Sequence, residues 1–159
     1  MKALFIGGTG TISSAITALA PQHGFDLYLL NRGNRNDLVP DGVTLIQADI
    51  NNENEVREKI KDMTFDVVAD FIAYDVEAAI RDVRLFQGRT KQYIFISSAS
   101  AYQKPLSNPF ITESTPLYNP YWEYSRNKIA IEEYLMKEYR ENGFPITIVR
   151  PSHTYGDFS

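Results

Sequence analysis

Short apolar runs alternate with longer segments of helical character along the chain, and this alternation limits the fold more than any other feature. Most of the runs are continuous, as in strands that are covered on both faces. Strands that alternate with helices form right-handed crossovers, so we predict an α/β fold with a doubly wound parallel sheet and helices on both faces. The predicted strands are about six, at 3–6, 27–30, 43–46, 65–69, 93–96 and 146–149, and the predicted helices are at 11–22, 53–62, 75–86 and 121–141.

Length and composition exclude several classes of protein. The chain has 159 residues, which suits a single domain over 1–159. Its net charge of −4 argues against a basic face for nucleic acid. It has no cysteine and two histidines far apart in sequence, so we expect no metal site. The apolar run before the first glycines is only four residues long, too short for a signal peptide or a membrane span, and we expect a cytoplasmic protein with no membrane partner.

A glycine-rich turn follows the first predicted strand directly, in the segment GGTGTIS at 7–13. In the Rossmann type of doubly wound sheet, such glycines let bare backbone approach a dinucleotide pyrophosphate at the positive end of the next helix. The alternative is an ordinary tight turn, but the position between the first strand and the first helix favours the dinucleotide. The residues expected to contact the cofactor here are Gly7, Gly10, Thr11 and Ile12.

The end of the second predicted strand bears on the choice between NAD and NADP. A carboxylate at this point suits the ribose 2′-hydroxyl of NAD, whereas an arginine suits a 2′-phosphate. Asn31 stands in the acidic position, and Arg32 and Arg35 follow it. A solvated basic loop would have the same composition, but we favour NADP over NAD.

Two further segments are expected to line the adenosine side of the cofactor. Asp49 and Ile50 follow the third predicted strand, where the carboxylate could meet the adenine amino group. Ile72 and Ala73 follow the fourth predicted strand. Because ligands bind at the carboxyl ends of parallel strands, we expect both segments beside the glycine turn.

A possible catalytic group comes from the last predicted helix and the strand before it. Tyr124 and Lys128 are four residues apart and therefore share a helix face. A nearby ammonium, helped by an oxidised nicotinamide ring, could lower the tyrosine pKa toward neutrality, as acid–base catalysis requires. Ser97 and Ser98 end the fifth strand, where a hydroxyl could hold a substrate oxygen. The alternative is an exposed tyrosine beside a solvated lysine.

Together these motifs resemble the extended short-chain dehydrogenase/reductase family, which includes nucleotide-sugar epimerases and dehydratases. The resemblance covers nearly the whole chain in family order: GGTG at 7–10, Asp49, SSASAY at 97–102, TESTP at 112–116, Tyr124 through Lys128, and RPSHTYG at 150–156. The chain departs from the family pattern at Ser13 in place of the third glycine, at ADF (69–71) in place of the usual ending of the fourth strand, and at Asp157, where proline often follows the last glycine.

The resemblance implies particular roles for the residues. It makes Tyr124 the acid/base, Lys128 the residue that holds the nicotinamide ribose, and Ser98 the substrate-orienting hydroxyl. It also puts Ser97, Pro151 and His153 beside the cofactor, although His153 could equally serve loop packing. The implied function is that of an NAD(P)-dependent oxidoreductase or sugar-nucleotide epimerase/dehydratase, with a small-molecule substrate.

Members of this family continue beyond the length of this chain, so the resemblance implies a cofactor-binding part without the C-terminal substrate portion. Two alternatives to an enzyme follow. One is a dinucleotide-binding module without turnover. The other is RNA binding, which chloroplast stem-loop RNA-binding relatives suggest and which the acidic charge makes unlikely.

The last expectation concerns association between copies of the chain. The helices predicted at 75–86 and 121–141 carry apolar residues on more than one face. One face covers the sheet, so a second apolar face requires another partner. The family resemblance implies a four-helix bundle between two copies, so we expect a homodimer; the alternative is that the loop at 103–120 covers this surface.

Overall fold

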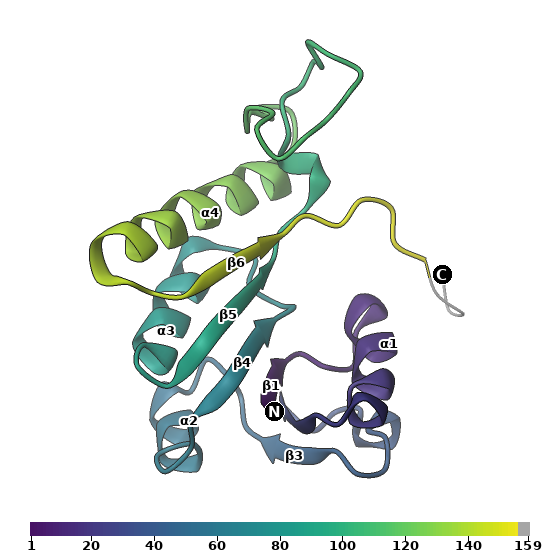
Figure 1. Cartoon of the computed structure of the whole chain (residues 1–159), viewed down its shortest axis with the longest axis vertical. Coiled ribbons are helices and arrows are strands. Elements are labelled where there is room, and N and C mark those ends of the chain that lie inside the picture. The colour runs from purple at the N-terminus through teal and green to yellow at the C-terminus, as the bar shows by residue number, and fades with distance from the viewer. Residues whose placement is uncertain (156–159) are drawn as a thin grey trace.

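A computed structural model describes residues 1–155 of the chain. It contains six strands in one parallel sheet, in the order β3-β2-β1-β4-β5-β6. The predicted doubly wound architecture is therefore confirmed (Figure 1). The strands are β1 (Lys2–Ile6), β2 (Asp26–Asn31), β3 (Thr44–Gln47), β4 (Phe65–Asp70), β5 (Thr90–Ile96) and β6 (Ile146–Val149).

The α-helices begin or end a few residues from their predicted limits. They are α1 (Thr11–Leu19), α2 (Glu53–Lys59), α3 (Val76–Phe86) and α4 (Glu123–Asn142). Helix α1 is shorter than predicted because Pro21 lacks an amide hydrogen, and the chain forms a 3₁₀ turn at Pro21–His23 instead. Helix α4 begins two residues later than predicted, so Tyr121 and Trp122 precede it.

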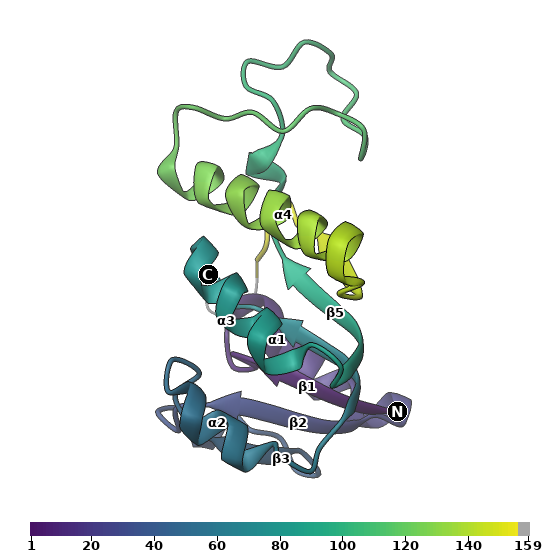
Figure 2. The ribbon, with the colours of Figure 1, turned by 90° about the vertical axis from the view of Figure 1, so that its left-hand side faces the viewer.

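Helices cover both faces of the sheet, but unequally. Figures 1 and 2 show α2, α3 and α4 on one face and α1 on the other. The three-helix face has a core of twenty buried apolar residues, including Phe86, Phe95 and Leu135. The α1 face has a core of six, around Phe5 and Leu29.

Register brings the carboxyl ends of the central strands together. Ile6 at the end of β1 pairs with Leu30 in β2 and with Asp70 at the end of β4. The order of strands reverses at β1, since β2 lies on one side of it and β4 on the other. In open α/β sheets this is the point where ligands bind. Within residues 1–155, no helix has the length and apolar character needed to cross a membrane.

Candidate functional site: a dinucleotide groove and an adjoining hydroxyl pocket

A groove of about 660 Å³ lies at the carboxyl ends of β1, β2, β3 and β4. The glycine turn forms one wall and the segment after β2 forms another. Of the residues predicted to bind a dinucleotide, those that line this groove are Gly7, Gly10, Asn31, Arg32, Arg35, Asp49, Ile50 and Ile72. Eight of the residues predicted to bind the cofactor therefore line one groove.

The glycine turn is held by hydrogen bonds that the sequence motif does not reveal. Gly7 has φ = +81°, and a Cβ there would approach the Cγ2 atom of Ile72 to 2.3 Å, so both the turn and the packing require glycine. Ser13, which replaces the third glycine, is buried and donates its hydroxyl to the Gly7 carbonyl at 2.7 Å. Its oxygen accepts from the Gly10 amide at 2.8 Å. Ser13 thus fixes the turn from inside α1.

The groove fits an anionic cofactor at the start of α1. The first amides of a helix have no partner within the helix and carry a partial positive charge. The first turn of α1 contains no acidic residue, and a Cβ on Gly10 would meet only the Ser13 hydroxyl, at 3.4 Å. This combination of open backbone and a positive helix end suits the pyrophosphate of a dinucleotide.

The segment after β2 takes part in the turn as well as in the groove. The Asn31 side chain accepts a hydrogen bond from the Gly8 amide at 3.2 Å. Arg35 donates to the Thr9 carbonyl at 3.1 Å across the glycine turn. Arg32 lines the groove with an exposed side chain. Asn31 is therefore a structural part of the turn, and Arg32 is the cation with the greater freedom to meet a ligand.

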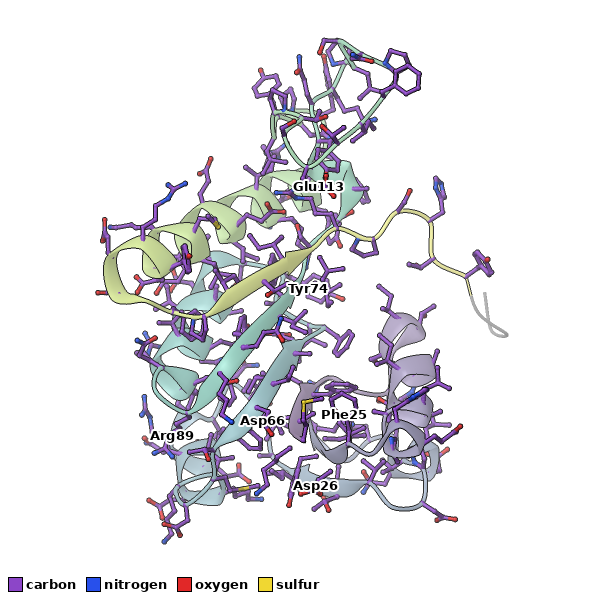
Figure 3. The ribbon with its side chains drawn as sticks, in the orientation of Figure 1. Phe25, Asp26, Asp66, Tyr74, Arg89 and Glu113 are labelled. Carbon is purple, nitrogen blue, oxygen red and sulfur yellow. The ribbon has the colours of Figure 1, made fainter. Side chains whose placement is uncertain are left out.

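Beside the groove lies a smaller pocket of about 140 Å³ at the ends of β5 and β6. Ser98, Tyr124 and Lys128 line it together with Ser97, Ile12 and Pro151. Tyr74 lines both cavities, which therefore lie side by side (it is labelled in Figure 3, near the carboxyl ends of the strands). The three predicted catalytic residues, from α4 and from the segment after β5, thus share one pocket next to the groove.

Lys128 is buried and held by two backbone carbonyls. Its ammonium group donates to the Ala73 carbonyl at 2.7 Å and to the Ile96 carbonyl at 2.9 Å. The Nζ atom also lies 5.5 Å from the centre of the Tyr124 ring. Burial lowers the pKa of Lys128 to about 8, while the carboxylates of Asp70 and Glu132 act in the opposite direction. Ala73, predicted to touch the cofactor, is fully buried and contributes its carbonyl to this lysine.

The phenol of Tyr124 is not prepared for proton transfer by the surrounding residues alone. Burial raises its pKa above the usual value and the neighbouring Tyr74 raises it further, whereas a hydrogen bond with Ser98 lowers it. The pKa of Tyr124 is therefore raised overall, whereas acid–base catalysis at neutral pH requires a lowered pKa. The tyrosine therefore needs a further positive charge nearby.

A chain of hydroxyl groups orients Ser98, and the sequence motifs gave no sign of it. The Ser125 hydroxyl donates to Ser100 at 2.9 Å, and the Ser100 hydroxyl donates to Ser98 at 2.9 Å. The Ser100 amide also donates to Ser98, at 3.1 Å. Because the Ser98 oxygen accepts both bonds, its own proton is available for Tyr124 or a substrate oxygen.

Ser97 differs from Ser98 although it stands next to it. It borders the small pocket, but its buried hydroxyl donates to Glu132. Arg150, after β6, makes a forked ion pair with the same carboxylate at 2.6–3.1 Å and also donates to the Tyr102 hydroxyl at 3.1 Å. This cluster joins the ends of β5 and β6 to α4.

The segment after β6 only partly matches its expected role. Pro151, Ser152 and Thr154 line the small pocket, whereas His153 is exposed and is not among its lining residues. Gly156 and Asp157, part of or next to the last sequence motif, lie outside the described residues.

Solved structures with the same fold include sugar-nucleotide enzymes. The dTDP-glucose 4,6-dehydratase of Bacillus anthracis, solved with NAD, is 21% identical with a TM-score of 0.84, over 100% of this chain and 57% of its own. The UDP-glucose 4-epimerase of Thermus thermophilus, also solved with NAD, is 21% identical with a TM-score of 0.80, over 94% of this chain and 54% of its own. WbmG of Bordetella bronchiseptica, solved with NAD and UDP, is 17% identical with a TM-score of 0.75, over 93% of this chain and 52% of its own.

At these identities the structural likeness establishes the fold, and the chain spans little more than half the length of these proteins. No curated protein matches the chain. The family described as the NAD dependent epimerase/dehydratase family matches residues 3–84 and 72–159, which together cover nearly the whole sequence. The chain therefore belongs to the NAD-dependent epimerase/dehydratase family.

Proposed function

We propose that this chain is the cofactor-binding and proton-transferring part of an NAD(P)-dependent oxidoreductase or sugar-nucleotide epimerase/dehydratase. The observation that carries the proposal is the meeting of Ser98, Tyr124 and Lys128 in one pocket that adjoins the glycine groove. A module that only binds a dinucleotide has no need of this set. The solved relatives with NAD, and WbmG with NAD and UDP, support a nicotinamide dinucleotide and a nucleotide-sugar substrate.

The cofactor would lie along the groove. Gly7, Gly10 and the first amides of α1, at Thr11 and Ile12, would hold the pyrophosphate, while Asp49 and Ile72 would line the adenosine side. The small pocket would take the nicotinamide end, with Lys128 near its ribose. When bound, the nicotinamide ring accepts or returns a hydride.

The residues of the small pocket would move and hold the proton. The Tyr124 phenolic oxygen takes the proton of a sugar hydroxyl and returns it, while Ser98 donates a hydrogen bond to the reacting oxygen. The residues around Tyr124 leave its pKa raised, so the phenolate would be stabilised by the Lys128 ammonium only together with the positive charge of an oxidised nicotinamide ring.

We also propose that NADP(H) is preferred to NAD(H). The exposed Arg32 lines the groove, and the position that would carry a carboxylate for the ribose 2′-hydroxyl is filled by Asn31, which is engaged with Gly8. A 2′-phosphate would meet the exposed guanidinium of Arg32 there.

The test combines binding with turnover. We expect calorimetry to show that the 159-residue chain binds NAD(P)(H) and that Tyr124→Phe changes the affinity less than threefold, because the ring and its packing remain. In a form of the protein that turns over a nucleotide sugar, the same substitution should lower kcat at least about 100-fold. Absence of dinucleotide binding, or near-normal turnover without the hydroxyl, would refute the proposal.

A homodimer through α3 and α4 is proposed as well. These helices pack side by side, and Ile80, Tyr134 and Met136 on them remain only half-buried within one copy. Light scattering over a concentration series should show a dimer, and Met136→Glu should reduce association while leaving the circular dichroism unchanged. A monomer at high micromolar concentration would contradict it.

A further inference from the structure

Four polar side chains are buried together beneath the groove, away from the residues already assigned to it. Asp70 ends β4, Arg81 and Asp82 lie on α3, and Tyr93 lies on β5; all four are at most 7% exposed. The Tyr93 hydroxyl donates to Asp82 at 2.5 Å and lies 3.4 Å from Asp70. Buried charges cost free energy even when they are paired, so a purely structural cluster could be replaced by apolar residues. The position of Asp70 indicates the role of this cluster.

One carboxylate oxygen of Asp70 holds the turn that follows β4. Its Oδ1 atom accepts from the Ile72 amide at 2.6 Å and from the Ala73 amide at 3.0 Å. Both residues serve the site directly: Ile72 packs against Gly7 and lines the groove, and the Ala73 carbonyl binds the Lys128 ammonium. Asp70 therefore fixes the carbonyl that positions the lysine.

Asp70 also acts on Lys128 through its charge. The groups that face the lysine are the carboxylates of Asp70 on β4 and Glu132 on α4, the two carbonyls, and the rings of Tyr74, Phe95 and Tyr124. The charge of Asp70 raises the lysine pKa against burial more than the charge of Glu132 does. Without it, the lysine would be less protonated at neutral pH.

Arg81 connects the same cluster to the opposite wall of the groove. Its guanidinium donates to the Asn51 side chain at 2.8 Å and binds Asp82, while its Nη2 atom lies 3.9 Å from Asp70. Asn51 lines the groove next to Asp49 and Ile50. One buried network thus reaches both the adenosine side and the catalytic lysine.

We propose that Asp70 is a positioning residue, which acts through Lys128 by fixing the Ala73 carbonyl and by keeping the ammonium charged when the dinucleotide binds. This inference rests on the proposed function. It assigns a role to a departure from the family pattern in ADF (69–71) that the catalytic residues do not explain.

The test uses Asp70→Asn in the 159-residue chain, because an amide still accepts from both backbone amides but carries no charge. We expect the Lys128 pKa, followed by ¹³Cε NMR, to fall further below about 8, and the affinity for NAD(P)(H) to fall about tenfold, as a loss of about 1.4 kcal/mol predicts. Asp70→Ala, which also frees the turn, should weaken binding more. In a Lys128→Met background, Asp70→Asn should change the affinity less than threefold, because its effect passes through the lysine.

Asp66→Asn is the matched control, since Asp66 is a carboxylate on the same strand that accepts a hydrogen bond from the Lys2 amide at 2.8 Å, but lies at the end of β4 opposite to the 72–73 turn. This control should leave the Lys128 pKa unchanged and the affinity for NAD(P)(H) within threefold of that of the unsubstituted chain. An equal effect of both substitutions, or an unchanged lysine titration in Asp70→Asn, would overturn the proposal. If the Asp70 variants do not fold, the unchanged chain decides: NMR couplings across both hydrogen bonds, from the Ala73 amide nitrogen to the Asp70 carboxyl carbon and from Lys128 Nζ to the Ala73 carbonyl carbon, support the inference, and absence of the first overturns it.

The failure of this inference can be told from the failure of the proposed function. A chain that binds no dinucleotide refutes the function, yet its lysine titration still tests Asp70. A chain whose affinity depends on Lys128 but not on Asp70 keeps the function and loses the inference.

Discussion

The α1 end of the site, which is the groove, has a wall of main chain, whereas the α4 end, which is the small pocket, is supported by buried side chains. Gly7, Gly10 and Gly33 line the first region, with the exposed Arg32 beside them. Lys128, Glu132 and Asp70, each at most 2% exposed, support the second. A ligand would therefore meet backbone and a solvated charge at the α1 end, and charges withdrawn from water at the α4 end. Single substitutions should separate the two.

The largest loss of stability is expected from Glu132→Gln at the α4 end. It removes the charge that pairs with Arg150 and leaves one acceptor oxygen in place of the two that now accept from Arg150 and Ser97, and breaking a buried ion pair costs about 3–5 kcal/mol. Urea unfolding should show this decrease in the free energy of unfolding. Glu133→Gln, one residue away and exposed, should cost about 0.5 kcal/mol or less. Similar values for the two would mean that the ion pair does not support this end.

The next largest loss of stability is expected from Gly7→Ala at the α1 end. The substitution adds a Cβ at positive φ, which costs about 1–2 kcal/mol, and forces Ile72 to move, which costs about 1–3 kcal/mol more. Gly88→Ala is the control, because Gly88 has φ = +74° and nothing within 4 Å of the added atom. The difference between the two unfolding free energies isolates the contact with Ile72. If the difference is zero, close packing at the turn is not what requires glycine.

The smallest effect on the fold should come from Arg32→Ala. The side chain is exposed, so the free energy of unfolding should change by about 0.5 kcal/mol or less. The affinity for NADP(H) should nevertheless fall about tenfold, equivalent to about 1.4 kcal/mol, while that for NAD(H) stays the same. Calorimetry with both dinucleotides measures this. Equal losses for the two ligands would show that Arg32 does not discriminate at the 2′ position.

The same contrast explains what the sequence could and could not predict. Local patterns carry the information for the strands, for the glycine turn and for the helix that places Tyr124 and Lys128 on one face. The doubly wound fold was predicted correctly for that reason. Helix limits were less accurate where Pro21 and Trp122 decided them.

The supporting interactions at the α4 end were not predictable, because their partners are far apart in sequence. Lys128 meets Ala73 across 55 residues, and Ser97 meets Glu132 across 35. No periodicity links such pairs, and only the sheet order brings them together. The hydrogen bonds from Ser13 to the glycine turn are local in sequence. A serine at a position where the family has glycine nevertheless indicates only that a small residue is needed, and does not reveal its two hydrogen bonds.

The unequal covering of the sheet has a consequence for how the molecule opens. Helix α1 buries only Ser13 and Thr17 and leaves Ile16 and Leu19 at least 42% exposed, so hydrogen bonds to the glycine turn hold it more than apolar contacts do. Proteins unfold locally where few apolar contacts must break. The amides of α1 should therefore exchange with solvent before those of α3 and α4. A dinucleotide at the start of α1 would bind the closed form alone and slow this exchange with increasing concentration, which makes α1 an internal reporter of ligand occupancy.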